Sequence, residues 1–226
     1  MTKTILVKTD QLSPADLANC VEALNRTLLK WAPKWNIQAT ATTDPKVKAD
    51  MVIKVTDLNR HTGALGYHTV EAGVPTAYIS PSALLHNVYG TFTPAHWSVA
   101  IWNLARTKIT RAAKQTAPAR YREGIVTVII HEALEMLADA NIDHVATAPD
   151  GKKWLVEVCD HVSGIYGTEN VAGNICVIPD ATFPSYYQSN GVAPFDLFNT
   201  EKSAFDRSAP KFYAFYQDAN GKWVAV

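Results

Sequence analysis

The segment from Ile129 to Asp139 reads IIHEALEMLAD and lies in the most apolar helix that the sequence predicts, from about Tyr121 to Ala140. Apolar residues cover most of the circumference of this helix, which is typical of a central, buried helix. His131 and Glu135 are four residues apart and therefore share one face, with Glu132 beside them. Because burying an unpaired charge is costly, these three ionisable side chains need partners inside the fold.

The same spacing occurs in the zinc-peptidase helix H-E-x-x-H, except that Glu135 stands where that helix has its second His. In that helix the two outer residues bind the metal, and the Glu after the first His polarises the metal-bound water and moves its proton. By this pattern His131 and Glu135 are metal ligands and Glu132 is the catalytic base. The alternative for so short a motif is a buried network of ion pairs that holds no metal.

A third protein ligand must come from another segment of the chain. The stretch Glu157-Val-Cys-Asp160 offers two acids, and either could reach the metal. We favour Asp160 and keep Glu157 as the alternative ligand. Tyr166 follows shortly afterwards and is a candidate catalytic residue that would donate a hydrogen bond to a developing oxyanion.

Two further placements of ionisable side chains have to be considered. A metal clasp made by His131, Glu135 and Asp139 on one helix is geometrically possible, although Asp139 better suits a supporting contact or a cap for the following loop. His68 lies on a predicted hairpin and could point into the cleft. The remaining histidines lie in loop-like sequence and are expected to be exposed: His61, His86, His96, His144 and His161.

The segments on either side of the central helix predict the rest of the fold. Hydrophobic periodicity and turn signals predict strands at 3–9, 37–42 and 49–55, a helix at 13–31, a hairpin whose second arm is 73–80, and a terminal hairpin at 212–226. This order indicates an α+β fold of the zincin type, with a mixed sheet, an active-site helix and a loop-rich C-terminal part. In such a fold the edge strand holds an extended peptide by strand addition, and Gly73 to Ser80 would be that edge.

The length of 226 residues suits one domain. We therefore expect a single zincin-like domain over residues 1–226. Residues 1–140 would form the sheet and the H-E-x-x-E helix, with an insertion at about 85–120. Residues 141–226 would form a loop-rich C-terminal subdomain, with loop-like sequence beyond residue 165.

The chain resembles a family of zincin-like proteins that are encoded mainly by phages and prophages. The likeness spans about residues 50–200. It is carried by HEALEMLADA from His131, EVCDHV from Glu157, Tyr166, FPSYY from Phe183, ALGYH from Ala64 and PTAY from Pro75. The chain departs from the family pattern at Ala140 and His161, where the family has Pro. The resemblance implies a zincin-like fold and a metal site, and it implies no particular substrate.

The expected ligand set also bears on the metal and the function. The zinc-peptidase pattern makes Zn²⁺ the expected ion. One His and two carboxylates nearly neutralise a divalent cation, which shifts the preference toward harder ions, so Mn²⁺ or Ca²⁺ is the alternative. We expect a metal-dependent hydrolase or peptidase that acts on a peptide or protein, with Glu132 as general base. The alternative is a non-catalytic phage virion or assembly protein that contacts other phage structural proteins.

Composition excludes several classes of function. Lys and Arg number 21, Asp and Glu also number 21, and the formal net charge is zero, which argues against a nucleic-acid binder and against a membrane-surface protein. The three cysteines, Cys20, Cys159 and Cys176, are expected to be reduced and buried. The N-terminal apolar run is too short for a signal peptide, so the expected location is the bacterial host cytoplasm or the phage virion.

Overall fold

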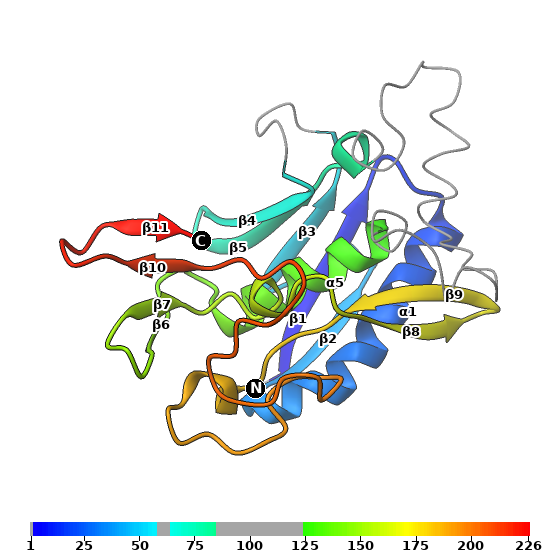
Figure 1. Cartoon of the computed structure of the whole chain (residues 1–226). Helices are drawn as coiled ribbons and strands as arrows, with labels where there is room; N and C mark the ends of the chain where they lie inside the picture. Colours follow the sequence, from blue (N-terminus) through cyan, green and yellow to red (C-terminus); the bar gives the residue numbers. More distant parts are fainter. Residues whose placement is uncertain (1, 58–63, 85–123) are drawn as a thin grey trace.

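The computed structural model describes residues 2–57, 64–84 and 124–226 (Figure 1). The predicted insertion at about 85–120 lies outside the described residues. Within them the protein is mixed α and β, with two long helices and several sheets, so the α+β fold class is confirmed. None of the described helices is long and apolar enough to cross a membrane.

The main sheet has five strands in the order β2-β1-β3-β5-β4. They are β1 (Thr2–Thr9), β2 (Gln38–Thr42), β3 (Met51–Val55), β4 (Gly66–Glu71) and β5 (Val74–Ile79). All neighbours are parallel except β4 and β5, which form an antiparallel hairpin. The alternating apolar residues Ile5 and Val7 of β1, and Ile53 and Val55 of β3, are fully buried, as expected for one face of a sheet packed on helices.

The prediction that Gly73–Ser80 forms the edge of the sheet is wrong. β5 lies inside the sheet, because Thr76 pairs with Val52 of β3 on one side and with Thr69 of β4 on the other. The edge strand is β4, the first arm of the hairpin. Pro75 does not prevent this arrangement, since it lies just before the residues of β5 that are in register with β3.

Two helices pack against the sheet and against each other (Figure 1). Helix α1 (Pro14–Trp31) contacts β1 and β2, and Ser13 caps it by accepting a hydrogen bond from the amide of Asp16. Helix α5 (Ile125–Ala138) contacts β3, β4 and β5. It is the predicted H-E-x-x-E helix, and its described part is shorter than the predicted range at both ends. Nearly all of its residues are buried, as its apolar circumference predicted.

The C-terminal part contains more regular structure than the sequence indicated. A hairpin of β8 (Tyr166–Val171) and β9 (Asn174–Pro179) packs against both long helices, although this stretch was predicted to be loop-like. Its short, continuous apolar run ICVI was obscured by the Pro-rich and aromatic sequence that follows. The predicted terminal hairpin is confirmed as β10 (Phe215–Gln217) and β11 (Trp223–Ala225). These strands join β7 (Lys153–Leu155) and β6 (Val145–Thr147) in a second sheet, of order β11-β10-β7-β6.

Short helical turns connect these strands and hold the segment next to α5 in place. The 3-10 turns are η1 (Ala32–Trp35), η4 (Asp160–Val162) and η5 (Pro184–Tyr187). The indole Nε1 atoms of Trp31 and Trp35 both donate to the carbonyl of Thr182, at 3.0 and 3.1 Å. The Thr182 amide in turn donates to the carbonyl of Val158 at 2.8 Å. The end of α1 is therefore connected to the segment that carries the predicted third ligand.

Candidate metal centre

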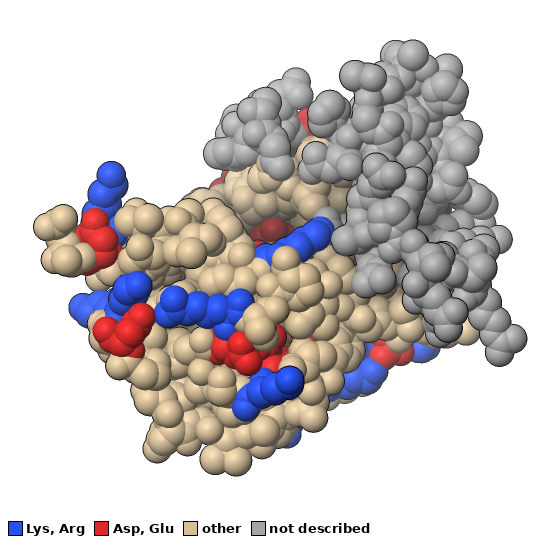
Figure 2. All heavy atoms as spheres, viewed as in Figure 1, with Lys and Arg blue, Asp and Glu red and all other residues tan. Residues whose placement is uncertain are grey.

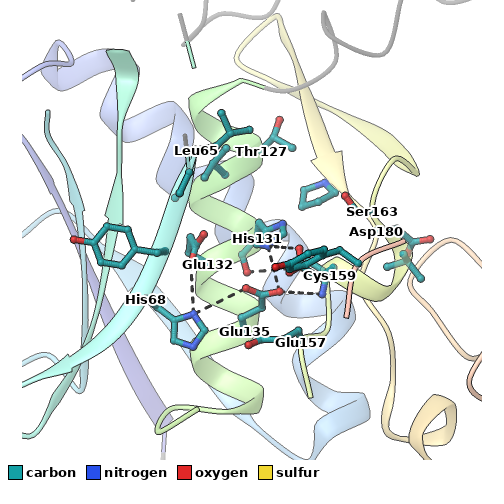
Figure 3. Close-up of a pocket in the computed structure, with 18 of the residues that line it drawn as sticks. Leu65, His68, Thr127, His131, Glu132, Glu135, Glu157, Cys159, Ser163 and Asp180 are labelled. Carbon is teal, nitrogen blue, oxygen red and sulfur yellow. Dashed lines mark hydrogen bonds and ion pairs between the residues drawn. The ribbon is translucent and has the colours of Figure 1, made fainter. Parts of the chain in front are cut away.

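A cavity of about 520 Å³ opens between α5, strand β4 and the segment from Glu157 to Tyr166. His131, Glu132 and Glu135 of α5 line it, as the helical spacing predicted. Glu157, Asp160 and Tyr166 also line it, so the structure brings all of the predicted site residues to one cavity. Figure 3 shows His131, Glu132 and Glu135 on the helix, with His68 of β4 on one side and the Glu157–Cys159 segment on the other.

His131 is held between two carboxylates. Its Nε2 atom lies 3.2 Å from Oε1 of Glu135 and 3.4 Å from Oδ1 of Asp160. Ligand atoms that share one ion at bond lengths of ~2.1 Å lie roughly 3 to 4 Å apart, and Nε2 of His131 has this spacing to each of the two carboxylate oxygens. Burial alone would lower the pKa of His131, but the charges of Glu135 and Asp160 raise that pKa well above its ordinary value.

Asp160 and Glu157 both have raised pKa values. Burial, followed by the nearby charge of Glu135, raises the pKa of Asp160 to about 7 and that of Glu157 to about 10. Within the described residues, Oε2 of Glu157 is buried and has no hydrogen-bond partner. A buried carboxylate oxygen without a donor is costly, and a metal ion would satisfy it.

Glu132 faces His68 rather than His131. Its Oε2 atom lies 3.5 Å from Nδ1 of His68, and both side chains are 6% exposed. Burial raises the pKa of Glu132 overall, although contact with the two histidines opposes the rise. Burial alone would lower the pKa of His68, but Glu132 and Glu135 raise it overall, with the Asp139 carbonyl adding a smaller contribution. The position of His68 in the cleft was considered from the sequence, and the structure places it there.

Cys159 is a site residue that the sequence analysis missed. Its Sγ atom and ligand atoms of His131 and Glu135 all lie within 4.8 Å of one another. Its amide donates to Oε1 of Glu135 at 3.4 Å, and burial raises the pKa of its thiol well above the ordinary value. The prediction that the three cysteines are buried is confirmed. The signal for a second role of Cys159 was its position between the two acids of the Glu157–Asp160 stretch.

Asp139 does not take part in a clasp with His131 and Glu135. Its carboxylate accepts hydrogen bonds from the amides of Asp143 and His144, at 2.9 and 3.0 Å, and so caps the loop after α5. This agrees with the role of a cap for the following loop that was considered for Asp139. Among the described ligand atoms, those of His131, Glu135 and Cys159 form one close group, and those of His68, Glu135 and Glu157 form another.

The expectation for His161 is wrong, because this side chain is buried at 1% exposure. Its ring stacks on Phe212 and Tyr186, and Nδ1 lies 2.8 Å from the hydroxyl of Tyr187. Burial lowers the pKa of His161 to about 3, so it packs as a neutral aromatic ring. His144 is exposed, as predicted. The predictions for His61, His86 and His96 fall outside the described residues.

Gly66 allows β4 to approach Glu132 closely. A Cβ atom at this position would lie 2.6 Å from Oε1 of Glu132 and 2.7 Å from Cγ1 of Val128. We expect Gly66→Ala to displace both side chains and to lower the free energy of unfolding by about 1–3 kcal/mol, the usual cost of overpacking. Urea unfolding measures the change, with Val70→Ala at an exposed position of the same strand as the control. An unchanged stability and an unchanged Glu132 pKa would contradict this account.

The stability of the metal-free protein should fall as the pH rises from about 5 toward about 10. In the folded state Glu157 has a pKa of about 10, which is raised by burial and by Glu135, so the folded chain keeps a proton that the unfolded chain releases. A raised carboxyl pKa therefore stabilises the fold at low pH, and this contribution is lost as the pH increases through that range. Asp160 adds to the loss up to about pH 7.

Urea unfolding in chelator at pH 6 and pH 9 measures this dependence, and Glu157→Gln is the matched variant. The variant cannot ionise, so the difference in stability between the two pH values should be smaller than in the parent. An identical difference in both proteins would show that Glu157 does not titrate abnormally.

Comparisons of the chain with protein-family models, with curated proteins and with solved structures found no match. The likeness to phage-encoded zincin-like proteins therefore rests on the sequence motifs alone. Functional inference depends on the side chains that line the cavity.

Proposed function

We propose that the protein is a metal-dependent hydrolase of peptide-like bonds, in which His131, Glu135 and Asp160 hold a divalent cation and Glu132 is the general base. The observation that carries the proposal is the convergence of Glu135 and Asp160 on Nε2 of His131, at 3.2 and 3.4 Å, in an open cavity. Glu132 comes from the same helix and lies beside this group without being part of it.

The ligand set suits several divalent ions. One imidazole and two carboxylates fit Zn²⁺, and the large share of oxygen ligands also fits Mn²⁺ or Ca²⁺. The thiol of Cys159 favours Zn²⁺ if it replaces a carboxylate, because thiolates are soft ligands. When bound, the cation supplies a Lewis acid that polarises the substrate carbonyl and lowers the pKa of water.

Glu132 would take a proton from the attacking water and return it to the leaving nitrogen. Its pKa is raised by burial, which moves it toward the neutral range where a general base is most effective. His68, 3.5 Å away, orients the carboxylate. Tyr166 lines the same cavity, and its hydroxyl would donate a hydrogen bond to the oxyanion.

The proposed substrate is an extended peptide, and the fold proposed for the chain is zincin-like. In the described part of the main sheet, no strand pairs with the outer edge of β4. The residues Gly66, Tyr67 and His68 of this strand line the cavity, so a peptide added at the edge would run past Glu132. An antiparallel edge strand beside the H-E-x-x-E helix is the layout expected of a zincin. Basic and acidic side chains are interspersed on the described face in Figure 2, which suits a substrate without a large net charge.

The test is cleavage of a diverse peptide mixture by protein loaded separately with Zn²⁺, Mn²⁺ and Ca²⁺, with products identified by mass spectrometry. We expect cleavage with at least one of these ions and its loss in chelator. If metal-loaded protein cleaves nothing, the alternative gains weight: a non-catalytic phage virion or assembly protein, which would co-purify with particles.

A further inference from the structure

The cluster around Glu135 has two sides. On one side Oε1 of Glu135 lies 3.2 Å from Nε2 of His131. On the other side Oε2 lies 4.0 Å from Nδ1 of His68. The two oxygens of a single carboxylate therefore face two different imidazoles, and Figure 3 shows Glu135 between them. A carboxylate in this position can bridge two cations.

The second side has its own complete group of ligand atoms. Atoms of His68, Glu135 and Glu157 all lie within 4.8 Å of one another. The group draws on three separate elements: strand β4, helix α5 and the segment that follows β7. Residues far apart in sequence are thus brought to one point. Glu135 connects that point to the proposed site of the first cation at His131 and Asp160.

Two buried polar atoms on this side, one from Glu157 and one from His68, make no hydrogen bond of normal geometry within the described residues. Glu157 is 7% exposed, and within the described residues its Oε2 atom accepts no hydrogen bond. The His68 side chain is 6% exposed, and its Nε2 atom makes no hydrogen bond of normal geometry in the same part of the chain. Its Nδ1 atom meets only carboxylate oxygens, at 3.5 and 4.0 Å. Native proteins rarely leave such groups unsatisfied, so their presence points to a ligand.

The charge of the cluster also favours a second bound cation. Glu132, Glu135, Glu157 and Asp160 surround the two imidazoles in one cavity. With both imidazoles neutral and all four carboxylates ionised, one divalent cation would leave a formal charge of about −2 on the cluster, and a second divalent cation would offset it. Two divalent cations neutralise the four carboxylates.

We propose that the protein binds a second divalent cation through His68, Glu135 and Glu157, with Glu135 bridging the two ions. This rests on the proposed function for the first cation, held by His131, Glu135 and Asp160. In two-metal hydrolases the ions lie ~3.5–4 Å apart, a separation that a bridging carboxylate spans. The pair would serve a hydrolase by binding the attacking oxygen and the substrate carbonyl separately. It also gives Glu157 a ligand role of its own, beside that of Asp160.

The test is the number of Mn²⁺ ions bound per chain, read by native mass spectrometry with Mn²⁺ as the only added metal. We expect two ions in the parent and one in both His68→Ala and Glu157→Gln. Electron paramagnetic resonance should show a spin-coupled Mn²⁺ pair in the parent and an isolated Mn²⁺ ion in the two variants. His144→Ala is the control, because His144 is an exposed histidine whose loss should leave both ions bound.

The possible outcomes separate failure of the second cation site from failure of the proposed function. A single bound ion in the parent, retained in His68→Ala, would overturn the second site and leave the proposed function standing. Two ions in the parent and in both variants would also overturn it, because the second ion would then be held elsewhere. No bound ion in the parent would overturn the proposed function as well. Glu157→Gln keeps the volume of the side chain, so it tests the site even if His68→Ala folds poorly.

Discussion

Replacing Glu135 with Gln should remove most of the metal that co-purifies with the protein. Glu135 contacts His131 at 3.2 Å and belongs to both groups of ligand atoms in the cavity, so its charge affects every proposed ligand bond. A neutral amide is a poor ligand for a divalent cation in a buried site. We expect the affinity for Zn²⁺ or Mn²⁺ to fall by at least ~100-fold, a loss larger than that usual for residues that only support a ligand.

Elemental analysis of protein purified without chelator measures this effect, beside Asp160→Ala as a second ligand variant. Glu22→Gln is the matched control, because Glu22 is a half-exposed residue of α1 that pairs only with Arg26 in the described contacts. Gln can keep the hydrogen bond from the Cys159 amide, so the variant should fold. Full metal content in Glu135→Gln would mean that His131 and Asp160 bind the ion without this carboxylate, and the ligand assignment would be wrong.

The sequence predicted the helix of the site because local rules determine it. The positions of His131, Glu132 and Glu135 on a common face follow from helical periodicity, and the burial of that helix follows from its apolar residues. Asp160 could be proposed because two acids close together follow an apolar run, and the structure brings it within 3.4 Å of His131. Each of these inferences needs only residues that are near one another in the chain.

The rest of the cavity depends on contacts between distant segments. His68 reaches Glu132 only because β4, and not β5, is the edge strand, and this choice is made by pairing with β3 across the sheet. The sequence of a hairpin does not show which arm faces outward. His161 is buried for a similar reason, since the aromatic rings of Tyr186 and Phe212, which pack against it, lie far away in the chain.

Glu132→Gln should abolish hydrolysis while leaving the metal content unchanged. Glu132 lies outside both close groups of ligand atoms, so the variant should keep its metal. Gln has nearly the same shape and can keep the contact with His68, which is 3.5 Å in the parent. It cannot accept a proton from water. We expect kcat to fall by about 10²–10⁴-fold, the usual contribution of a general base, with little change in KM.

Measuring kcat and metal content on the same preparations separates the roles of this residue. A Glu132→Gln protein that keeps both its metal and full activity would show that another group is the base. Loss of metal together with activity would make Glu132 a ligand. The ion would then have one more carboxylate ligand than the proposed set provides. Only loss of activity with metal retained is consistent with Glu132 as a general base, because a proton acceptor contributes to the transition state and not to the binding of the ion.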